Sequence, residues 1–596
     1  MRQIQLFIIS FIICGSNAFA QEQPNTFVFE GNNFRWTQTT NGSLFYDETE
    51  GLPGLEVPIG EENHSIFTST LWVGGMNDAD ELKISFRRFC QNDNENCQEN
   101  WGPLKLDGSM ATPAEVANFN KIWFVTIAQI EAHLAFTECQ NNPNCDESIE
   151  FPNYEIPEDF SSWPAEGEAG FAENLAPYVD YDSNGAYNPE MGDHPAICGD
   201  FSSYTIWNDL GAEGASSDGN EIGLEVHTVV YGYESEQESD FNTLFVQHKL
   251  INRGAQALNE TYSGFWTDFD LGNPSDDRLR TDVERSMFFV YNGASIDQPS
   301  PSGPGYGEDL PAMAVKVLSG PLSPGDLVDN TPEYSSLYAN ETIGWDDGII
   351  DNERLGLSSA MYQQNSQGPS ATQGPQISME YYNFMRGIWR DNSEQIFGGL
   401  GYNPVAIDPV MALYTLPGES DPLLAGTNGI DPDYPFEGGW TEENEEFAPD
   451  DRRMIGSSGP FTFAPGDVQY IDLAYIFARE SFDDNETVIE TLQRFADEVE
   501  GMQCSPLPSI VLSADSSIEP KNLTVYPNPA KNEIAFDLPL AQSVMTLFDI
   551  TGKKIRQARL QGRNQRIDIE NLNSGVYLIR IESVNSIYHG KFVVGK

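Results

Sequence analysis

The sequence has few basic residues, with 31 lysines and arginines against 92 aspartates and glutamates, which gives a formal net charge of −61. A surface this acidic repels nucleic acid and anionic lipid, so neither is an expected partner, and it favours multivalent cations. The charge is uneven, because the segment from Lys521 onward holds 11 basic and only 6 acidic residues. The acidic body and this C-terminal segment are therefore expected to be separate units.

The signatures of several common enzymes are also missing. The sequence has no G-x-S-x-G nucleophile elbow, no H-E-x-x-H motif, no Walker A loop and no dinucleotide fingerprint. The 6 histidines are scattered and no C-x-x-C pair is present, so a zinc site is not expected. These absences remove most of the support for the common hydrolase and nucleotide-binding classes.

Long apolar runs are scarce, and the one near the N-terminus is short. Leu6–Cys14 follows the positively charged Met1-Arg2 and precedes Ala18-Phe19-Ala20. This order is typical of a secretory signal peptide, predicted over residues 1–20. The run is about half of the roughly 20 residues that a membrane span needs, and no later run reaches that length. We therefore expect no transmembrane segment after signal cleavage.

Cysteine is rare, and its pattern fits an oxidising exterior. Cleavage of the signal peptide removes Cys14 and leaves an even number of cysteines, which favours disulfides in an exported protein. The simplest of the fifteen possible connectivities joins two close pairs that enclose polar loops and leaves one long-range bridge. These pairs are Cys90–Cys97, Cys139–Cys145 and Cys198–Cys504.

Composition and pattern together predict a mainly β protein. Its 35 phenylalanines and 24 tyrosines are ample for hydrophobic cores in a chain of 596 residues. Short alternating runs such as Ser65–Val73 recur between turn signals, and Glu225–Tyr233 with Thr243–Ile251 has the pattern of a hairpin. Strands this numerous favour an antiparallel β-sandwich-like body with a few helices.

Two helices have clear signals. The first follows the capping sequence Thr112-Pro113-Ala114-Glu115, which places a proline at the first helical position. Its apolar positions at helical spacing are Val116, Phe119, Trp123, Ile127, Ile130 and Leu134. The second is predicted over about 485–502, and its apolar face consists of Val488, Leu492, Phe495 and Val499.

These signals predict five segments in chain order. After the signal peptide, residues 21–176 form a β-rich region with one helix, and residues 177–504 form an acidic β-rich body that ends in a helix. Residues 505–521 are a linker, and residues 522–596 are a small terminal domain.

The terminal domain carries four landmarks in a fixed order. They are Tyr526-Pro527-Asn528-Pro529, the turn Asp549–Lys553, the strand start Ser574–Tyr577 and the closing Lys591–Val594. This set resembles the type A C-terminal sorting domain of bacterial type IX secretion cargo. The resemblance implies a small Ig-like β-sandwich, recognition by the type IX secretion machinery, and a secreted or outer-surface location. The matching signal residues are Tyr526, Pro527, Asn528, Pro529, Gly552, Gly575, Tyr577 and Lys591.

The body resembles, more loosely, large secreted proteins that carry the same tail. The residues behind this likeness include Leu71–Gly75, Trp266–Asp277 and Met385–Trp389, which are spread along the body. That group has no established activity to transfer, so the resemblance leaves the function of the body open.

An acidic loop after residue 179 is a candidate calcium site. It places oxygen side chains at positions one, three, five and nine around a glycine, which is the spacing of a calcium-binding loop. Its twelfth position is Met191, so Glu190, Asp193 or a more distant group would complete the shell. The alternative is that the polar residues only cap an irregular turn. The predicted calcium ligands are Asp180, Asp182, Asn184, Asn188 and Asp193.

A second acidic loop follows the predicted strand that ends at Trp266. Its carboxylates repel one another unless a cation or the nearby Arg278, Arg280 and Arg285 compensate. Three interpretations stay open: a metal or ion-pair structure, a solvated loop, and a glycosidase-like pair with one protonated and one ionised carboxyl. The candidate catalytic residues of the third interpretation are Asp268, Asp270, Asp276 and Asp277.

The sequence as a whole predicts an exported, calcium-stabilised and non-enzymatic β-rich protein. Its expected role is adhesion, through binding of a surface glycan or a matrix component. The first alternative is a secreted glycan-active hydrolase that uses paired carboxylates. The second is a subunit of a larger surface assembly.

Overall fold

The computed structural model describes most of the chain. The described residues are 24–48, 50–87, 100–167, 170–210, 220–301, 303–331, 342–365, 368–482, 485–504 and 521–595, the last with gaps at 524, 538–541, 550–553, 562–563, 570–571, 573–574 and 584–585. The predicted signal peptide, the pair Cys90–Cys97 and nearly all of the predicted linker lie outside these residues. The chain divides into two compact units, one formed by most of the residues up to 509 and one that contains residues 510–596. No helix among the described residues is both long and apolar enough to cross a membrane.

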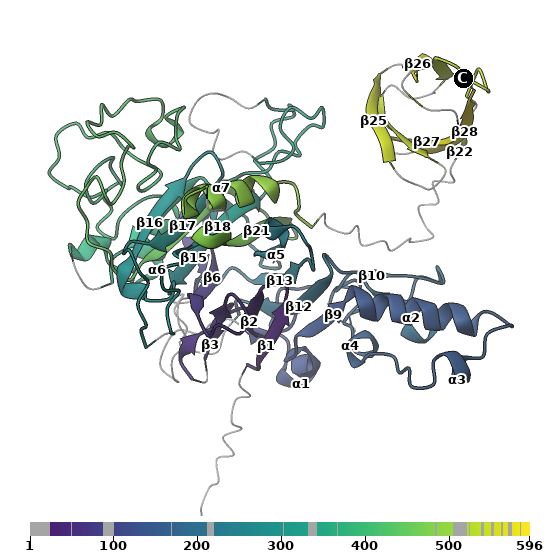
Figure 1. Ribbon diagram of the computed structural model, residues 1–596, viewed down its shortest axis with the longest axis horizontal. Helices are drawn as coiled ribbons and strands as arrows, with labels where there is room; N and C mark the ends of the chain where they lie inside the picture. The colour runs from purple at the N-terminus through teal and green to yellow at the C-terminus, as the bar shows by residue number, and fades with distance from the viewer. Residues whose placement is uncertain are drawn as a thin grey trace, which may run out of the picture. The chain divides into compact units, whose positions relative to one another are not determined.

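The first unit is built on two large antiparallel sheets (Figure 1). One sheet has eight strands, in the order β1 (Thr26–Gly31), β2 (Phe34–Thr39), β5 (Leu55–Glu56), β6 (His64–Asn77), β15 (Leu258–Phe269), β20 (Arg453–Phe463) and β19 (Ser359–Gln363), with β7 (Leu82–Ser85) paired to β6. Sequence-distant segments therefore lie side by side at its centre, where β15 separates β6 from β20.

The other sheet has nine strands. Their order is β16 (Asp277–Asp282), β17 (Met287–Asn292), β18 (Pro311–Ser319), β21 (Val468–Arg479), β14 (Thr243–Asn252), β13 (Leu224–Gly232), β12 (Phe201–Asn208) and β8 (Asn100–Trp101), with β9 (Trp123–Thr126) also paired to β12. The predicted hairpin is confirmed, because β13 and β14 pair antiparallel with Val230 opposite Val246.

The two sheets share one hydrophobic core. The Tyr475 hydroxyl on β21 lies 2.8 Å from Ser69 Oγ on β6, and its ring meets the Phe45 ring edge-on at 5.0 Å. Phe269 on β15 packs similarly against Phe288 on β17, at 6.2 Å between ring centroids. These contacts join the sheets face to face, so the prediction of an antiparallel β-sandwich is confirmed.

The outer face of the nine-stranded sheet is covered by α7 (Val488–Glu498) (Figure 1). The Thr487 side chain caps this helix by accepting a hydrogen bond from the Glu490 backbone N–H, and the Glu490 carboxylate accepts one from the Thr487 backbone N–H. Alanines on β18 and β21 leave room for the helix to pack closely. The helix is shorter than its predicted bounds of 485–502, and its four predicted apolar residues are all buried.

The prediction of one long helix after residue 112 is wrong. The capping sequence starts only the short α1 (Pro113–Val116), Trp123–Thr126 is the strand β9, and a new cap at Thr126 starts α2 (Ile127–Gln140). Trp123 and Val125 are buried where β9 pairs with β12, and this burial outweighs the helical spacing of the apolar residues. The region also contains α3 (Glu147–Glu150) and α4 (Glu158–Ser161).

The described residues of the first unit also form short elements. The paired strands are β3 (Tyr46–Asp47) with β4 (Leu52–Pro53), and β10 (Tyr178–Val179) with β11 (His194–Pro195). The remaining α-helices are α5 (Glu238–Phe241) and α6 (Ser378–Met385). The 3-10 helices are η1 (Ala117–Phe119), η2 (Pro189–Met191), η3 (Pro274–Asp276), η5 (Ser370–Thr372), η6 (Ala425–Thr427) and η7 (Glu480–Phe482). Helix α6 packs on β15, β19 and β20 of the eight-stranded sheet.

The second unit is a small two-sheet domain with its own core. One sheet has the order β22 (Lys521–Asn522), β28 (Ser586–Val594), β27 (Gly575–Ser583), β24 (Gln542–Asp549) and β25 (Lys554–Gln561). The other pairs β23 (Glu533–Asp537) with β26 (Asn564–Asp568). Residues of both sheets, among them Phe536 and Ile579, are buried in the shared core, which confirms the predicted small terminal sandwich.

Candidate functional site

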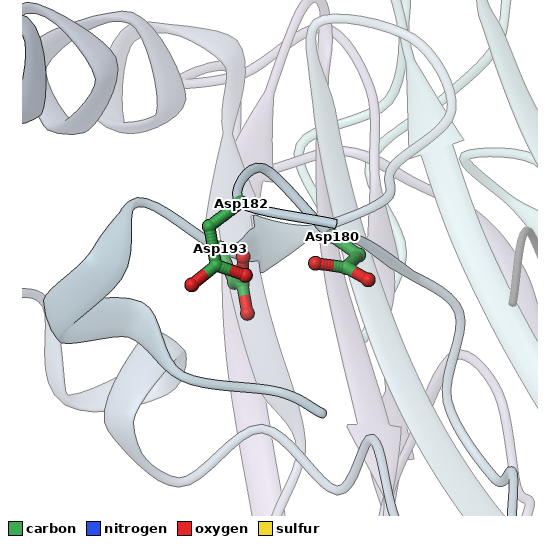
Figure 2. Close-up of side chains that lie close together, drawn as sticks. All are labelled: Asp180, Asp182 and Asp193. Carbon is green, nitrogen blue, oxygen red and sulfur yellow. The ribbon is translucent and has the colours of Figure 1, made fainter. Parts of the chain in front are cut away.

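The predicted calcium loop is closed by a two-stranded ribbon. Val179 of β10 lies opposite His194 of β11, so Asp180 and Asp193 leave the ribbon at the same end. Asp182 follows in the connecting turn. One carboxylate oxygen from each of the three aspartates lies within 4.8 Å of the others (Figure 2). The fold therefore brings together three of the five predicted ligands.

Asp193 is the fixed centre of this group, because it is fully buried and held by the backbone. Its Oδ1 accepts a hydrogen bond from the Tyr181 N–H and its Oδ2 from the Asn188 N–H, both at 2.7 Å. Burial raises the pKa of Asp193, and the neighbouring Asp180 and Asp182 raise it further. A bound cation would relieve both effects.

The other two predicted ligands are placed differently. Asn188 Oδ1 accepts a hydrogen bond from the Glu190 N–H at 3.0 Å and so caps η2, which is the alternative role of a turn residue. Asn184 is exposed in the same turn, and its role as a ligand stays a prediction. The donor set that remains consists of hard oxygen atoms on a short loop, and these fit a calcium ion.

The second acidic loop is split by the fold. Asp268 and Asp270 group with Asp451, again with oxygens within 4.8 Å, and the Arg453 side chain supplies a positive charge there. Arg453 Nε donates to Asp268 Oδ1 at 2.8 Å, and its Nη2 lies 3.5 Å from Asp451 Oδ2. The register of β15 on β20 places Asp268 opposite Arg453, a partnership that no local sequence signal could have revealed.

Asp276 and Asp277 lie apart from this group, at the end of η3 and the start of β16. Asp277 is fully buried at the start of β16, and burial raises its pKa well above the usual range of a carboxyl. Asp276 Oδ1 accepts a hydrogen bond from Asn292 Nδ2 at 2.8 Å, and burial with nearby Asp297 raises its pKa to about 6. A catalytic pair needs access to substrate, so the burial of Asp277 favours a structural role for it.

Of the three arginines that were expected to compensate this loop, Arg285 pairs with Asp282 at its end, and Arg278 and Arg280 pair with a carboxylate outside it. Arg278 and Arg280 both lie within 4.0 Å of Glu443, because alternation along β16 turns them away from buried Asp277. Arg285 pairs with Asp282 and with Asp497 of α7. The charges of Arg278 and Arg280 are therefore balanced by a carboxylate distant in the sequence, while Arg285 also has a local partner.

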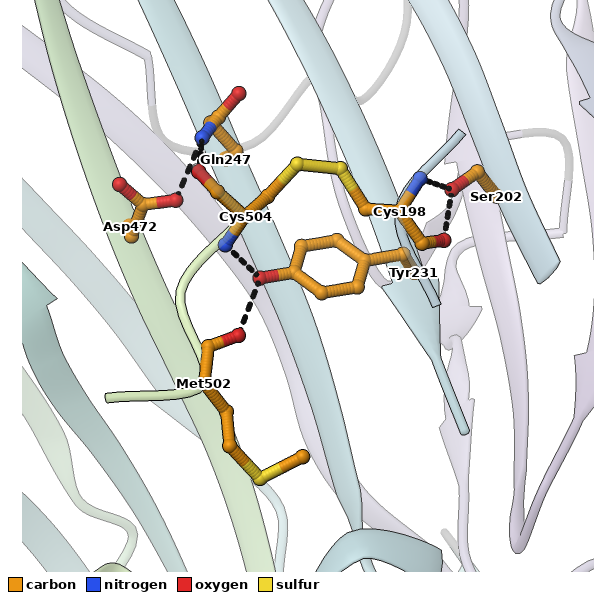
Figure 3. The surroundings of a disulfide bond; sticks show 7 residues. All are labelled: Cys198, Ser202, Tyr231, Gln247, Asp472, Met502 and Cys504. Atoms are coloured by element: carbon orange, nitrogen blue, oxygen red, sulfur yellow. Dashed lines mark hydrogen bonds between the residues drawn. A yellow bond between two sulfur atoms is a disulfide. The ribbon is translucent and has the colours of Figure 1, made fainter. Parts of the chain in front are cut away.

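Both predicted disulfides within the described residues form. Cys139–Cys145 closes the C-terminal end of α2, and Cys198–Cys504 joins residues 306 positions apart. The second bridge is surrounded by hydrogen bonds that hold Cys504, at the C-terminal end of the body (Figure 3). The Cys504 N–H donates to the Tyr231 hydroxyl at 2.8 Å, and Gln247 Nε2 donates to the Cys504 carbonyl at 2.7 Å.

Gln247 also contacts a buried carboxyl, because its Nε2 donates a second hydrogen bond to Asp472 Oδ1 at 2.7 Å. Burial raises the pKa of Asp472 to about 7, against about 3.9 in an unfolded chain. A raised folded-state pKa stabilises the fold at low pH, and this contribution is lost between about pH 4 and pH 7 as the pH rises.

Replacement of Asp472 by Asn is therefore expected to stabilise the protein at high pH. The amide keeps an acceptor for Gln247 and has no charge to bury. We expect Asp472→Asn to raise the free energy of unfolding by about 2–4 kcal/mol at pH 8 and much less at pH 5. Urea denaturation at the two pH values measures the difference. An equal effect at both values would contradict this assignment.

The terminal unit ties its opening motif to its last strand. Asn528 Oδ1 accepts a hydrogen bond from the Val593 N–H at 2.9 Å, and Asn528 Nδ2 donates to the Lys591 carbonyl at 3.2 Å. The buried Tyr577 ring stacks on Phe592 at 5.7 Å. The opening motif, the strand start at Gly575–Tyr577 and the closing motif are thus in contact through β27 and β28, while Gly552 lies outside the described residues.

Residues 524–595 match the family model described as the secretion system C-terminal sorting domain. The terminal unit is a type IX secretion sorting domain. A protein that carries a type IX sorting domain is secreted or displayed on the outer cell surface, and its sorting domain interacts with the type IX secretion machinery. The body before it is the exported cargo.

Comparisons of the whole chain add no function. No curated protein matches the chain. A polysaccharide lyase aligns over 66% of this chain and 38% of its own, at 7% identity and a TM-score of 0.18. The β-glucuronidase of Lactobacillus rhamnosus aligns over 27% and 28%, at 10% identity and a TM-score of 0.10. PorZ, a surface component of the type IX secretion system of Porphyromonas gingivalis, aligns over 72% and 48%, at 13% identity and a TM-score of 0.11. The chain spans less than half of each of these proteins, and scores this low support no functional conclusion.

Proposed function

We propose that this type IX cargo is a calcium-stabilised binding protein that serves adhesion to a glycan or matrix component outside the cell. The observation that carries the calcium part is the group of Asp180, Asp182 and Asp193, whose oxygens lie within 4.8 Å of one another. Extracellular modules bind calcium through such oxygen ligands at dissociation constants of about 10⁻⁴–10⁻³ M. A protein outside the cell is exposed to the calcium of the surrounding medium, so the bound ion would stabilise the exported fold.

The adhesive role is supported by the architecture of the body. A large sandwich, clasped by a long-range disulfide and delivered by a sorting domain, offers a durable surface outside the cell. The hydrolase alternative has weaker support, because Asp277 is buried and Asp268 is held by Arg453. Binding therefore accounts for the described residues better than paired-carboxylate catalysis does.

The calcium part predicts a calcium-dependent stability. With calcium at about 100 times its dissociation constant, the free energy of unfolding of the secreted protein should rise by about 2.7 kcal/mol over the chelated state. Asp182→Asn should remove most of this increase, since the exposed Asp182 is a proposed ligand whose loss does not open the core. Thermal unfolding with calcium and with excess chelator, at fixed ionic strength, measures both effects.

Asp80→Asn is the matched control, because Asp80 is an exposed aspartate outside the group. This variant should keep the full response to calcium. Equal melting temperatures with calcium and with chelator would sink the calcium proposal. An equal loss of the response in both variants would show a general charge effect instead of a site.

A further inference from the structure

A polar cleft opens on the body at the end of the nine-stranded sheet. Its volume is about 460 Å³, which is within the range of small-ligand sites. The walls come from β16 and the turn after it, from loops around residues 417–420 and 437–444, and from α7. Every one of these elements belongs to the first unit. None of the residues proposed above as calcium ligands lines the cleft.

Arg280 supplies hydrogen-bond donors to this cleft. Its Nη2 lies 3.4 Å from Glu443 Oε2, and its guanidinium lies over the Tyr291 ring at 5.5 Å from the centroid. The Tyr291 hydroxyl donates to Glu443, so the three side chains hold one another in place. The Nε of Arg280 is buried and is not available to a ligand, whereas the side chain as a whole is 28% exposed and lines the cleft. Arg280 is therefore held in place, and the donors that it offers to the cleft are those of its terminal guanidinium nitrogens.

The rim of the cleft supplies acceptors. Glu284 and Glu437 are exposed carboxylates that line it, and within the described part of the chain their side chains make no hydrogen bond or ion pair. Glu419 also lines the cleft and accepts one hydrogen bond, from the Gly438 N–H at 3.2 Å. Each of these carboxylates keeps capacity for further hydrogen bonds.

We propose that this cleft binds a neutral carbohydrate segment. Closely spaced donors and acceptors suit a ligand whose groups both donate and accept, and sugar hydroxyls do both. The carboxylates outnumber the arginines among the lining residues, so a uronic-acid or sulfated glycan would be repelled. The mostly polar walls also disfavour a lipid. This inference rests on the proposed glycan-binding function and assigns it a site.

The experiment uses the full secreted protein in calcium-containing buffer. Isothermal titration against a panel of neutral di- to tetrasaccharides, with matched uronic-acid oligosaccharides, should detect binding only by neutral members. Glu284→Gln combined with Glu437→Gln should weaken this binding roughly 10-fold or more, because hydrogen bonds to charged groups are the stronger ones. Glu419→Trp, which fills the cleft from its rim, should abolish binding while the melting temperature stays unchanged.

Glu236→Gln is the control, since Glu236 is exposed and does not line the cleft. It should bind as the unsubstituted protein does. Neutral glycan binding that survives in Glu419→Trp would overturn the cleft assignment and leave the proposed glycan-binding function standing. Failure of every glycan in the panel would overturn the cleft assignment and the glycan part of the proposed function, and would leave binding of a matrix component as its remaining form. Binding of uronic-acid oligosaccharides through the cleft would overturn the ligand class.

Discussion

Truncation of the last six residues, Lys591–Lys596, is expected to stop export of the protein. The deletion removes the second half of β28, the strand that pairs with both β22 and β27. It also removes Phe592 and Val594, which are almost fully buried in the core of the sorting domain. The opening motif loses its partners at the same time, because Asn528 bonds to residues 591 and 593.

The energetic margin of so small a domain explains the size of the effect. A domain of about 70 residues is stabilised by only about 4–11 kcal/mol. Loss of one buried aromatic side chain such as Phe592 costs about 3–5 kcal/mol, before any lost strand pairing is counted. The truncated sorting domain should therefore be unfolded and unable to present its landmarks to the secretion machinery.

Immunoblots of culture medium, cell surface and periplasm measure the outcome. The truncated protein should be found in the periplasm and fall to background outside the cell. Leu578→Thr is the matched control, because Leu578 is an exposed residue of the neighbouring strand β27, lies outside the four landmarks and should leave export unchanged. Secretion of the truncated chain at the normal level would show that these landmarks do not direct it.

Removal of the Cys198–Cys504 disulfide is expected to cause the largest loss of stability in the body. The bridge spans 306 residues, and closing a long loop removes more conformational freedom from the unfolded chain than closing a short one. We expect the double replacement by serine to lower the free energy of unfolding by about 3–5 kcal/mol. The hydrogen bonds at Cys504 are to its backbone, so they do not depend on the sulfur.

The second bridge offers a built-in comparison. Cys139–Cys145 encloses a loop of sequence separation 6, so its replacement by serine should cost less, about 1–2 kcal/mol. Chemical denaturation of both double variants under non-reducing conditions gives the two values. A loss in the short-loop variant that equals or exceeds that of the long-loop variant would contradict the loop-length explanation.

Much of the fold follows from local patterns. Alternation of apolar and polar residues predicted the hairpin of β13 and β14, and the spacing of Val488, Leu492 and Phe495 predicted α7. The same kind of spacing failed at Trp123. There a strand forms because pairing with β12 buries its side chains, and a neighbour from another part of the chain is not visible in a local pattern.

The candidate sites show the same division. The alternate oxygens after residue 179 predicted a group that includes Asp180 and Asp182, because ligands on one short loop need only a turn to meet. The second acidic loop could not be resolved in this way. Asp268 lies on a strand of the eight-stranded sheet and Asp277 on a strand of the nine-stranded sheet. Asp451, which is far along the chain, lies beside Asp268.

The sequence alone determined the export route and the mainly β class, because these depend on composition and on ordered local motifs. It favoured the pairs Cys139–Cys145 and Cys198–Cys504 as the simplest of fifteen connectivities, and the structure decided that they form. The tertiary structure decided which carboxylates are buried, which are paired with arginine and which line the cleft of Arg280. Those properties depend on strand register and on the packing of layers. Register and packing bring together residues hundreds of positions apart, so local sequence patterns do not predict these contacts.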